Sequence, residues 1–297
     1  MFFTVRIRRP LLILCCAAVM AAALVGANAA SRCLEKKAAV NTAGDIKTGT
    51  KLPVIMYHSM LKEQKRLGKY VISPDSFEGD LKYLQKNRYH TITVRELVDA
   101  VKQHRPLPQK PVMLTFDDGY YNNYLYAYPL AKKYGAKIII APVGYYSDLF
   151  SESDADHANY SHLTWNEIQK MMDSGIVEFQ NHSYNLHSTK GRLGAQRKRG
   201  ESLAQYAALL NRDVGKMQAE FKEKTGYTPL AFVYPYGACS KGSDAILKQM
   251  GFQATFGCTQ KTNTITEDPE CLYSLGRFLR PAGISSEAFF RRIDIDH

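Results

Sequence analysis

The sequence predicts an α/β fold, a distorted (β/α)7-type barrel around a parallel sheet. Short apolar segments alternate with segments of helical periodicity about seven times, which is typical of parallel strands joined by crossover helices. Polar residues able to do chemistry stand directly after several of these apolar segments, and active sites of parallel β/α folds lie at that end of the strands. No internal sequence repeat is detectable.

The chain begins with a predicted export signal. Three arginines precede an uninterrupted apolar stretch from Leu11 to Gly26, and Ala27-Asn28-Ala29 follows with small residues at the two positions that a signal peptidase reads. The stretch is long for a signal peptide, so an uncleaved N-terminal anchor is the alternative for residues 1–29. Either form predicts an extracellular or cell-envelope location.

The rest of the chain is predicted to be a linker followed by one domain. Residues 30–51 are polar and lack apolar periodicity, which indicates a linker. Residues 52–297 form the predicted domain, and the 45% hydrophobic content of the chain supports a sizeable core. We expect a monomer.

The net charge is +11, and without the three arginines of residues 1–29 it is +8, much of which comes from one part of the domain. A stretch without acidic residues carries five cations: Lys190, Arg192, Arg197, Lys198 and Arg199. One interpretation is a solvated loop, and the other is attraction to a membrane surface or to anionic polymers of the cell envelope. No nucleic-acid-binding motif is present, and an exported protein rarely meets nucleic acid, so that partner is not expected.

Four of the six cysteines lie beyond the leader: Cys33, Cys239, Cys258 and Cys271. An exported chain tolerates disulfides, and we expect Cys258 to pair with Cys271, closing a polar loop of twelve intervening residues. No two cysteines have the close spacing of a zinc ribbon, which disfavours structural zinc.

Predicted strands and helices alternate through the first half of the domain. Leu52–His58 is typical of a buried strand with His58 at its carboxyl end. Ser73 and Pro74 mark the start of a helix, and Thr93 begins another as part of a capping box. The other elements expected here are strands at 91–93, 111–114 and 136–141 and a helix at 120–134, with 142–162 as loop.

The same alternation continues in the second half. Thr164 and Glu167 form another capping box, and the helix that it begins ends near Gly175. Apolar residues at helical spacing predict a six-turn amphipathic helix within 201–225. The remaining expected elements are strands at 176–179, 231–234, 252–256 and 275–279 and helices at 243–250 and from Ser285 onward.

Two adjacent carboxylates, Asp117 and Asp118, follow the apolar run 111–114, and Gly119 comes next. Strand side chains alternate between faces, so neighbouring aspartates can share one site only where the strand gives way to a loop. A polar turn that caps a strand and a helix is the alternative for a bare Asp-Asp-Gly.

A second polar group follows the strand at 176–179 and contains His182 and His187. Two imidazoles and one carboxylate are a common catalytic zinc set, with three protein ligands and one position left for water. The second aspartate would then be spare, and a carboxylate beside metal-bound water is what a general base requires.

These two motifs resemble those of the polysaccharide deacetylases, the NodB-like domain of family 4 carbohydrate esterases. The resemblance covers the chain from about Leu52 to the C-terminal helix, so residues 52–297 would be the catalytic domain. It implies a NodB-like barrel and a hydrolase that removes N-acetyl groups from N-acetylglucosamine residues of a cell-wall or extracellular polysaccharide. Asp117 would be the base, and Asp118, His182 and His187 would hold Zn²⁺, although such ligands also accept Co²⁺, Ni²⁺ or Mn²⁺.

The resemblance assigns further residues to the site. Pro235-Tyr236-Gly237 corresponds to the family's proline-containing motif, so the Tyr236 N–H would stabilise the oxyanion and its neighbours would line the substrate. His58 ends a tyrosine-histidine strand like those of many deacetylases of this branch, although a lone histidine there is also typical of a hydrogen-bonded core residue.

This sequence departs from the usual family pattern in three ways. Four residues rather than three separate His182 from His187, a form similar to deacetylases of poly-N-acetylglucosamine. Val233 stands where an arginine usually orients the base; Arg277 is the expected substitute, and a structural ion pair is its alternative role. The usual late histidine that acts as general acid is missing, so we assign that role to His58.

Two other classes of protein compete with this assignment. A carbohydrate-binding pseudoenzyme would keep the metal but lack a proton donor, and would release no acetate. A glycoside hydrolase would use the two aspartates as acid and nucleophile, needs no histidines, and would resist a chelator.

Overall fold

The computed structural model describes residues 49–153 and 156–293. The predicted leader, most of the predicted linker, Cys33 and the terminal His297 lie outside these ranges. The first strand begins at Thr50, two residues before the expected start of the domain.

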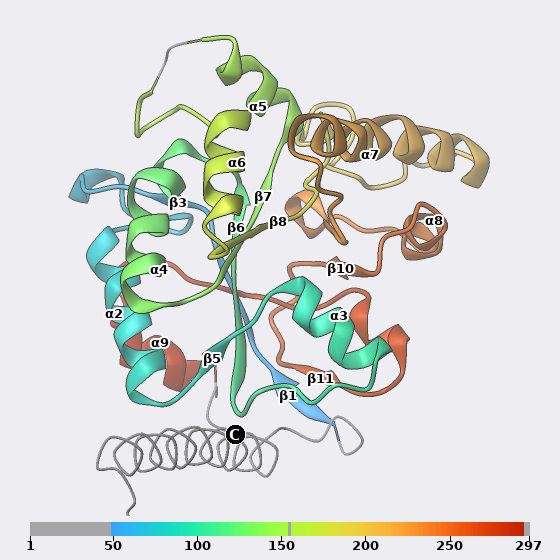
Figure 1. Ribbon diagram of the computed structural model, residues 1–297. Helices are drawn as coiled ribbons and strands as arrows, with labels where there is room; N and C mark the ends of the chain where they lie inside the picture. Colours follow the sequence, from blue (N-terminus) through green and yellow to red (C-terminus); the bar gives the residue numbers. More distant parts are fainter. Residues whose placement is uncertain (1–48, 154–155, 294–297) are drawn as a thin grey trace, which may run out of the picture. The chain divides into compact units, whose positions relative to one another are not determined.

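Parallel strands form the centre of the fold, as predicted (Figure 1). The main sheet has the order β12-β2-β6-β7-β8, with β5 added beside β6 and every pairing parallel. Its strands are β2 (Val54–Tyr57), β5 (His90–Thr91), β6 (Pro111–Asp118), β7 (Ile138–Pro142), β8 (Val177–Phe179) and β12 (Phe278–Leu279).

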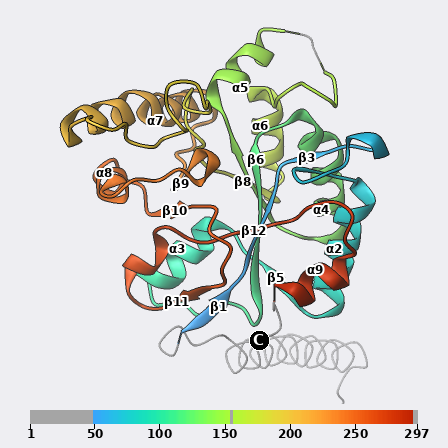
Figure 2. The ribbon, with the colours of Figure 1, turned by 180° about the vertical axis from the view of Figure 1, so that it is seen from behind.

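The sheet closes into a barrel through a separate strand pair and two isolated bridges. β9 (Ala231–Val233) and β10 (Ala254–Phe256) pair in parallel. A parallel bridge from Asn181 to Phe232 joins the segment after β8 to β9, and a second from Phe256 to Leu275 joins β10 to the segment before β12 (Figure 2). These two weakly paired seams are why the (β/α)7-type barrel is distorted.

Helices cover the barrel, and most of them begin where the sequence predicts (Figure 1). Side-chain caps from Ser73, Thr93, Thr164, Ser202 and Ser285 begin five of them. The helices are α2 (Pro74–Lys86), α3 (Val94–Lys102), α4 (Tyr128–Tyr134), α5 (Gly144–Ser151), α6 (Trp165–Asp173), α7 (Leu203–Thr225), α8 (Ser243–Gln249) and α9 (Ser286–Arg292). Among the described residues, none of these helices combines the length and apolar character needed to span a membrane.

Several local expectations were wrong, each for an identifiable reason. The expected strand 52–58 is divided at Pro53, and its first part, β1 (Thr50–Leu52), pairs antiparallel with an unpredicted strand, β11 (Asn263–Ile265). The expected loop 142–162 contains α5, which lacks a side-chain cap and therefore carries no start signal. The helix expected over 120–134 contains a π-helical turn, η2 (Asn123–Ala127), just before Pro129 in α4, because proline cannot donate the usual backbone hydrogen bond.

Short 3₁₀ turns complete the described chain: η1 (Gln64–Arg66), η3 (Pro235–Gly237) and η4 (Pro269–Leu272). Two more strands of two residues each, β3 (Ser59–Met60) and β4 (Val71–Ile72), pair in parallel beside the barrel.

The expected Cys258–Cys271 disulfide is absent, and both thiols are free. The Cys258 Sγ lies 3.8 Å from a nitrogen of Arg277, whereas the Cys271 Sγ lies 3.6 Å from the Thr266 carbonyl oxygen. The two cysteines therefore occupy different environments, one facing Arg277 and one within η4, and sequence spacing alone could not reveal this.

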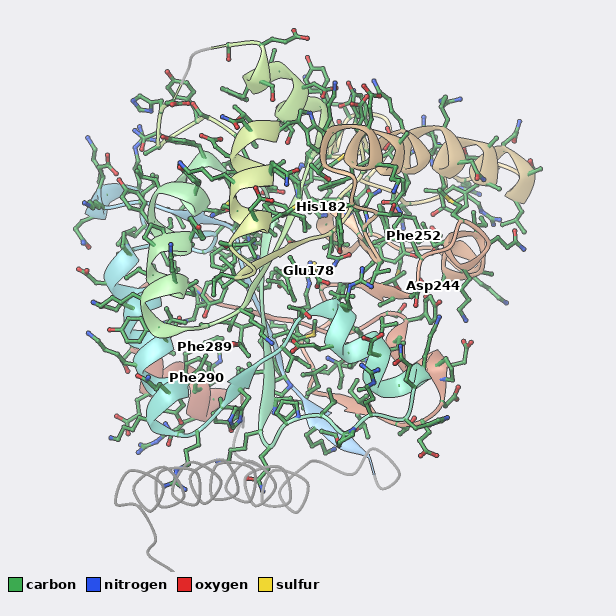
Figure 3. All side chains as sticks on the ribbon, viewed as in Figure 1. Glu178, His182, Asp244, Phe252, Phe289 and Phe290 are labelled. Atoms are coloured by element: carbon green, nitrogen blue, oxygen red, sulfur yellow. The ribbon has the colours of Figure 1, made fainter. Side chains whose placement is uncertain are left out.

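Alternation along the strands separates the barrel interior from the helical layer. On β6, Leu114 and Phe116 join the core under α2, α4 and α6, whereas Met113 faces the other core with residues of β7, β9 and α3. Asp117 shares the face of Met113, so its carboxylate is directed into the barrel at the carboxyl end of β6. Glu178 on β8 faces the start of α3 (Figure 3), which packs against the interior residues.

Candidate metal and catalytic site

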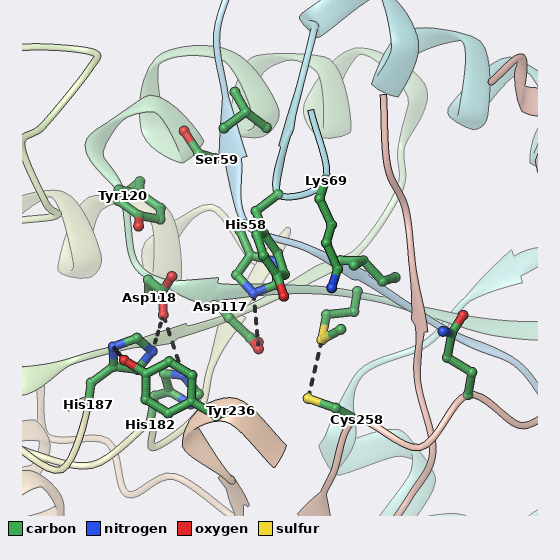
Figure 4. Close-up of a pocket in the computed structure, with 15 residues that line it drawn as sticks. His58, Ser59, Lys69, Asp117, Asp118, Tyr120, His182, His187, Tyr236 and Cys258 are labelled. Atoms are coloured by element: carbon green, nitrogen blue, oxygen red, sulfur yellow. Dashed lines mark hydrogen bonds and ion pairs between the residues drawn. The ribbon is translucent and has the colours of Figure 1, made fainter. Parts of the chain in front are cut away.

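Asp117 and Asp118 end strand β6, and the backbone turns between them and the next residue. Asp118 has a φ of 69° and Gly119 a φ of 68°, so the strand stops here. Without this turn Asp118 would point to the helical layer, opposite to Asp117. A Cβ at Gly119 would lie 2.5 Å from Pro142 of β7, so only glycine fits this approach. Both carboxylates consequently reach the same rim of the barrel (Figure 4).

His182 and His187 are brought together by a loop rather than by a helix. Asn181 and Ser183 begin this loop, and the Asn181 side chain accepts a hydrogen bond from the Ser183 N–H at 2.8 Å. Ser183 has a φ of 75°, and its hydroxyl accepts a hydrogen bond from the Leu186 N–H at 3.1 Å. These bonds explain how four intervening residues can still place both imidazoles at one point.

The three candidate metal ligands converge on one point. The Nε2 atoms of His182 and His187 lie 3.5 Å and 3.0 Å from Asp118 Oδ1, and one ligand atom from each residue lies within 4.8 Å of the others. The Nδ1 of His182 is 2.7 Å from the Val233 carbonyl oxygen, so it donates its proton there and leaves the Nε2 lone pair directed at the cluster. Burial raises the pKa of Asp118, but the two imidazoles outweigh it and hold that pKa well below the usual range.

This donor set fits a divalent cation. Asp118 Oδ1 is buried and accepts no hydrogen bond, although two ring nitrogens approach it. Two imidazoles and one carboxylate match the ligands of catalytic zinc sites and leave positions open for water or substrate. Other divalent ions bind the same donors.

Asp117 is held by Arg277, which the sequence left with two alternative roles. The Arg277 guanidinium makes two hydrogen bonds to the Asp117 carboxylate, at 2.6 and 2.8 Å, and a third at 2.8 Å to the Gly257 carbonyl oxygen. Both side chains are buried. Burial raises the pKa of Asp117, but the charge of Arg277 and these hydrogen bonds lower it by a larger amount. The net pKa is therefore below the usual value. Asp117 is therefore an ionised carboxylate with a fixed orientation.

His58 lies on the other side of Asp117, directly after β2. Its Nε2 is 4.0 Å from Asp117 Oδ2, and its ring meets Tyr70 edge-on at 4.9 Å between centroids. Its Nδ1 is buried without a hydrogen-bond partner. Burial lowers the pKa of His58, and the attraction of Asp117 opposes this only in part.

Pro235-Tyr236-Gly237 forms η3 at the end of β9, facing His187. Tyr236 has a φ of 59°, and its ring lies 4.5 Å from that of His187. The Tyr236 N–H donates no hydrogen bond to any residue in the described ranges. A Cβ at Gly237 would lie 2.6 Å from that of Cys258, so this position excludes a side chain.

A cavity of about 400 Å³ connects these groups (Figure 4). Its walls also include residues to which the sequence analysis assigned no role in the site: Met56, Lys69, Tyr70, Tyr120, Cys258 and Gln260. The loop after β3 carries Lys69 and Tyr70, and the segment after β10 carries Cys258 and Gln260. Among the tyrosines in the segment after Gly119, Tyr120 lines the cavity, whereas Tyr124, Tyr126 and Tyr128 pack against the core.

His162 is a half-buried histidine that no sequence motif pointed to. Its ring stacks on Tyr146 at 4.4 Å and lies 4.8 Å from Tyr120. Burial lowers its pKa to about 4, which keeps it neutral at neutral pH. It forms part of the wall behind Asp118 rather than the ligand cluster.

Comparison with known proteins gives consistent similarities. The family model of polysaccharide deacetylases matches residues 104–255. A poly-β-1,6-N-acetyl-D-glucosamine N-deacetylase of Escherichia coli K12 is 27% identical over 195 residues, 59% of this chain; this match spans only 29% of the relative's length. The enzyme of the same name from Staphylococcus epidermidis is 23% identical over 80% of this chain and 76% of its own.

Solved structures show the same relationship. A de-N-acetylase from Aggregatibacter actinomycetemcomitans is 26% identical and superimposes with a TM-score of 0.67. This superposition covers 82% of the present chain and 100% of the other. The IcaB structure from Ammonifex degensii has a TM-score of 0.64 over 85% of this chain and 97% of its own, and at 24% identity it supports the fold.

Proposed function

The chain belongs to the polysaccharide deacetylase family, and we propose that it is an exported, metal-dependent hydrolase that removes N-acetyl groups from N-acetylglucosamine residues of a cell-wall or extracellular polysaccharide. The observation that carries this proposal is the convergence of Asp118, His182 and His187 beside a separately held carboxylate, Asp117. Three of these groups can bind a divalent ion, and the fourth, Asp117, is not a ligand and can act as a base.

Asp118, His182 and His187 would hold the ion, with Zn²⁺ the best match to their donor atoms. When bound, such an ion polarises the acetamide carbonyl and lowers the pKa of water. The tautomer of His182 is set by Val233, so this ligand needs no rearrangement before binding.

Asp117 acts as the general base. Its carboxylate is ionised and oriented by Arg277, so it accepts a proton from the attacking water without first losing one of its own. Arg277 thereby serves the purpose of the arginine that is missing at Val233. The bidentate contact also prevents the Asp117 carboxylate from turning away as its charge changes.

The negative charge that develops on the acetyl oxygen needs a hydrogen-bond donor. The Tyr236 N–H is free to donate, and the positive φ of Tyr236 holds the backbone in the turn that presents it, with Pro235 and Gly237 on either side. Donors fixed before the reaction stabilise such charge without reorganisation.

His58 donates the proton to the leaving amine nitrogen. It lines the same cavity and faces Asp117 at 4.0 Å, so it reaches the reacting amide from the side opposite the ligand cluster. Burial lowers its pKa, so the protonated form that donates is a minor fraction at neutral pH and becomes smaller as pH rises. This donor argues for an enzyme rather than a binding-only protein.

The substrate and setting are inferred from the relatives and the leader. Two relatives carry the name poly-β-1,6-N-acetyl-D-glucosamine N-deacetylase, which supports a polymer of N-acetylglucosamine as substrate. Arg192 forms a bidentate ion pair with Glu201, while Lys190, Arg197, Lys198 and Arg199 form no ion pair among the described residues and are available for an anionic envelope surface. We expect a monomer without nucleic-acid partners.

The test is acetate release from defined N-acetylated oligosaccharides. We expect activity that is lost with a chelator, regained with Zn²⁺, and lowered by at least about 10²-fold in Asp117→Asn. His187→Ala should lose metal binding as well, whereas Asp117→Asn should retain it. Metal binding by the parent chain without acetate release from any oligosaccharide would overturn the proposal.

A further inference from the structure

Lys69 is an exposed cation in the wall of the cavity. It lies on the far side of His58 from the Asp118 cluster, and its amine is directed into the cavity (Figure 4). Its Nζ is 5.1 Å from the centroid of the Tyr70 ring, and it forms no ion pair with any residue in the described ranges. Gln260 and Leu279 line the cavity with it. No step of the proposed reaction uses this amine.

No carboxylate of the cavity neutralises Lys69, so its charge is free to act on the substrate. Asp117 is paired with Arg277 by two hydrogen bonds. Asp118 belongs to the ligand cluster and faces His182 and His187. A sugar that occupies the cavity beside the reacting unit therefore meets the positive charge of Lys69.

The charges outside the cavity have the same sign. The segment that carries Lys69 also holds Lys62, Lys65 and Arg66, with Glu63 as its only acidic residue. On the side of Tyr236, the basic stretch 188–200 packs on the same turn, because a Cβ at Gly194 would lie 2.5 Å from the Pro235 carbonyl oxygen. A polymer that approaches the cavity from either direction meets a positive field.

We infer that Lys69 makes the enzyme discriminate against units whose neighbour has already been deacetylated. This inference rests on the proposed function. Each turnover converts a neutral acetamide into an amine that is protonated at neutral pH, so the product of one reaction becomes a cation in the neighbouring subsite of the next. Repulsion by Lys69 then directs the enzyme to units flanked by acetylated sugars and produces scattered rather than contiguous free amines.

The expected discrimination is modest and measurable. Two unit charges at adjoining positions of a partly exposed site repel enough to change relative kcat/KM by about five- to tenfold. The effect should depend on pH with a defined sign. An amine of this kind loses its proton at about pH 8, as α-amino groups do. Discrimination should therefore be present at neutral pH and vanish near pH 9.

The experiment is a competition between two oligosaccharides of equal length, one fully acetylated and one with a single glucosamine next to the reacting unit. The ratio of their kcat/KM values cancels the titration of the catalytic groups, which both substrates share. We expect the parent chain and Lys69→Arg to prefer the fully acetylated oligosaccharide about five- to tenfold, and Lys69→Gln to lose the preference. Lys65→Gln, which removes a charge from the same segment outside the cavity, should retain most of it.

Four results separate the possibilities. Equal preference in the parent chain and Lys69→Gln would overturn the inference, as would a preference that persists unchanged near pH 9. Loss of kcat in Lys69→Gln with the preference intact would assign Lys69 to the reacting unit instead, and would also overturn it. Absence of acetate release from both oligosaccharides by the parent chain would be a failure of the proposed function, which the acetate assay detects separately.

Discussion

Arg277 holds Asp117, 160 residues away in the sequence, in its ionised form. Neither residue is informative alone, since a buried arginine is costly and a buried aspartate is usually protonated. Together they form a bidentate pair in which the carboxylate stays ionised inside the barrel. The structural ion pair and the orienting role, which the sequence left as alternatives, are the same contact.

Replacing Arg277 should shift the pH profile of the enzyme. In Arg277→Met burial is no longer offset, so the pKa of Asp117 rises and the base becomes protonated at pH values where the parent is ionised. We expect the acidic limb of kcat/KM to move to higher pH and activity at neutral pH to fall by about 10- to 100-fold. Arg277→Lys keeps the positive charge but cannot make both hydrogen bonds to Asp117. It should shift the acidic limb less than Arg277→Met does.

The pH profile distinguishes this role from a purely structural one. A variant that is merely less stable would lose activity at all pH values and keep the parent's acidic limb. Thermal unfolding of each variant provides the control, because only folded protein should be compared. An unmoved acidic limb in Arg277→Met would contradict the assignment.

Among the secondary-structure elements, α3 has an unusual N-terminus. Besides its own capping box, its first two N–H groups donate to the carboxylate of Glu178 on β8, from Val94 at 2.6 Å and Arg95 at 3.1 Å. The helix covers one end of the barrel interior, so this contact attaches α3 to the sheet. Burial raises the pKa of Glu178 to about 7.

This pKa predicts a pH-dependent stability. The folded state holds the Glu178 proton more tightly than the unfolded chain, so the stabilisation is complete at low pH and declines as pH rises from about 4.5 to about 7. The decline should be about 2 to 3 kcal/mol in the free energy of unfolding. Glu178→Gln should flatten the curve over this interval in denaturant titrations, whereas Glu152→Gln, at an exposed position, should leave its shape unchanged.

The whole domain is tied together by a second buried ion pair, on the side of β2 that faces the helices. Arg280, just after β12, contacts both carboxylate oxygens of Asp80 on α2 at 2.9 to 3.1 Å, and the Tyr57 hydroxyl donates to the same carboxylate at 3.0 Å. The guanidinium also lies 4.9 Å from the Phe289 ring of α9 (Figure 3). One cluster thus joins the first and last β/α units of the described barrel.

Removing one member of this pair should destabilise the fold strongly, whereas removing both members should destabilise it little. Arg280→Met leaves the Asp80 carboxylate buried without its partner, and we expect a loss of about 3 to 5 kcal/mol in the free energy of unfolding. The double variant Asp80→Leu/Arg280→Met removes both charges and should recover most of that loss. Urea titration measures both, and a double variant as unstable as the single one would contradict the argument.

The sequence predicted the barrel and most of its helix starts because these depend on local chemistry. Capping residues such as Thr93 and Thr164 act within one turn of chain, and apolar periodicity reports which face of a segment is buried. Elements without a local signal were missed: α5 has no side-chain cap, and β11 exists because it pairs with β1 more than 200 residues away.

For the site, the sequence by itself determined which side chains are chemically able to bind a metal and to accept a proton, because residue type and position after a strand are local properties. The tertiary structure decided what those side chains face. The turn at Asp118 that reverses one carboxylate, the guanidinium that reaches Asp117, the separation of Cys258 from Cys271 and the amine of Lys69 in the cavity all depend on contacts between distant segments. Such contacts follow from how the barrel closes, and no local pattern of residues encodes that closure.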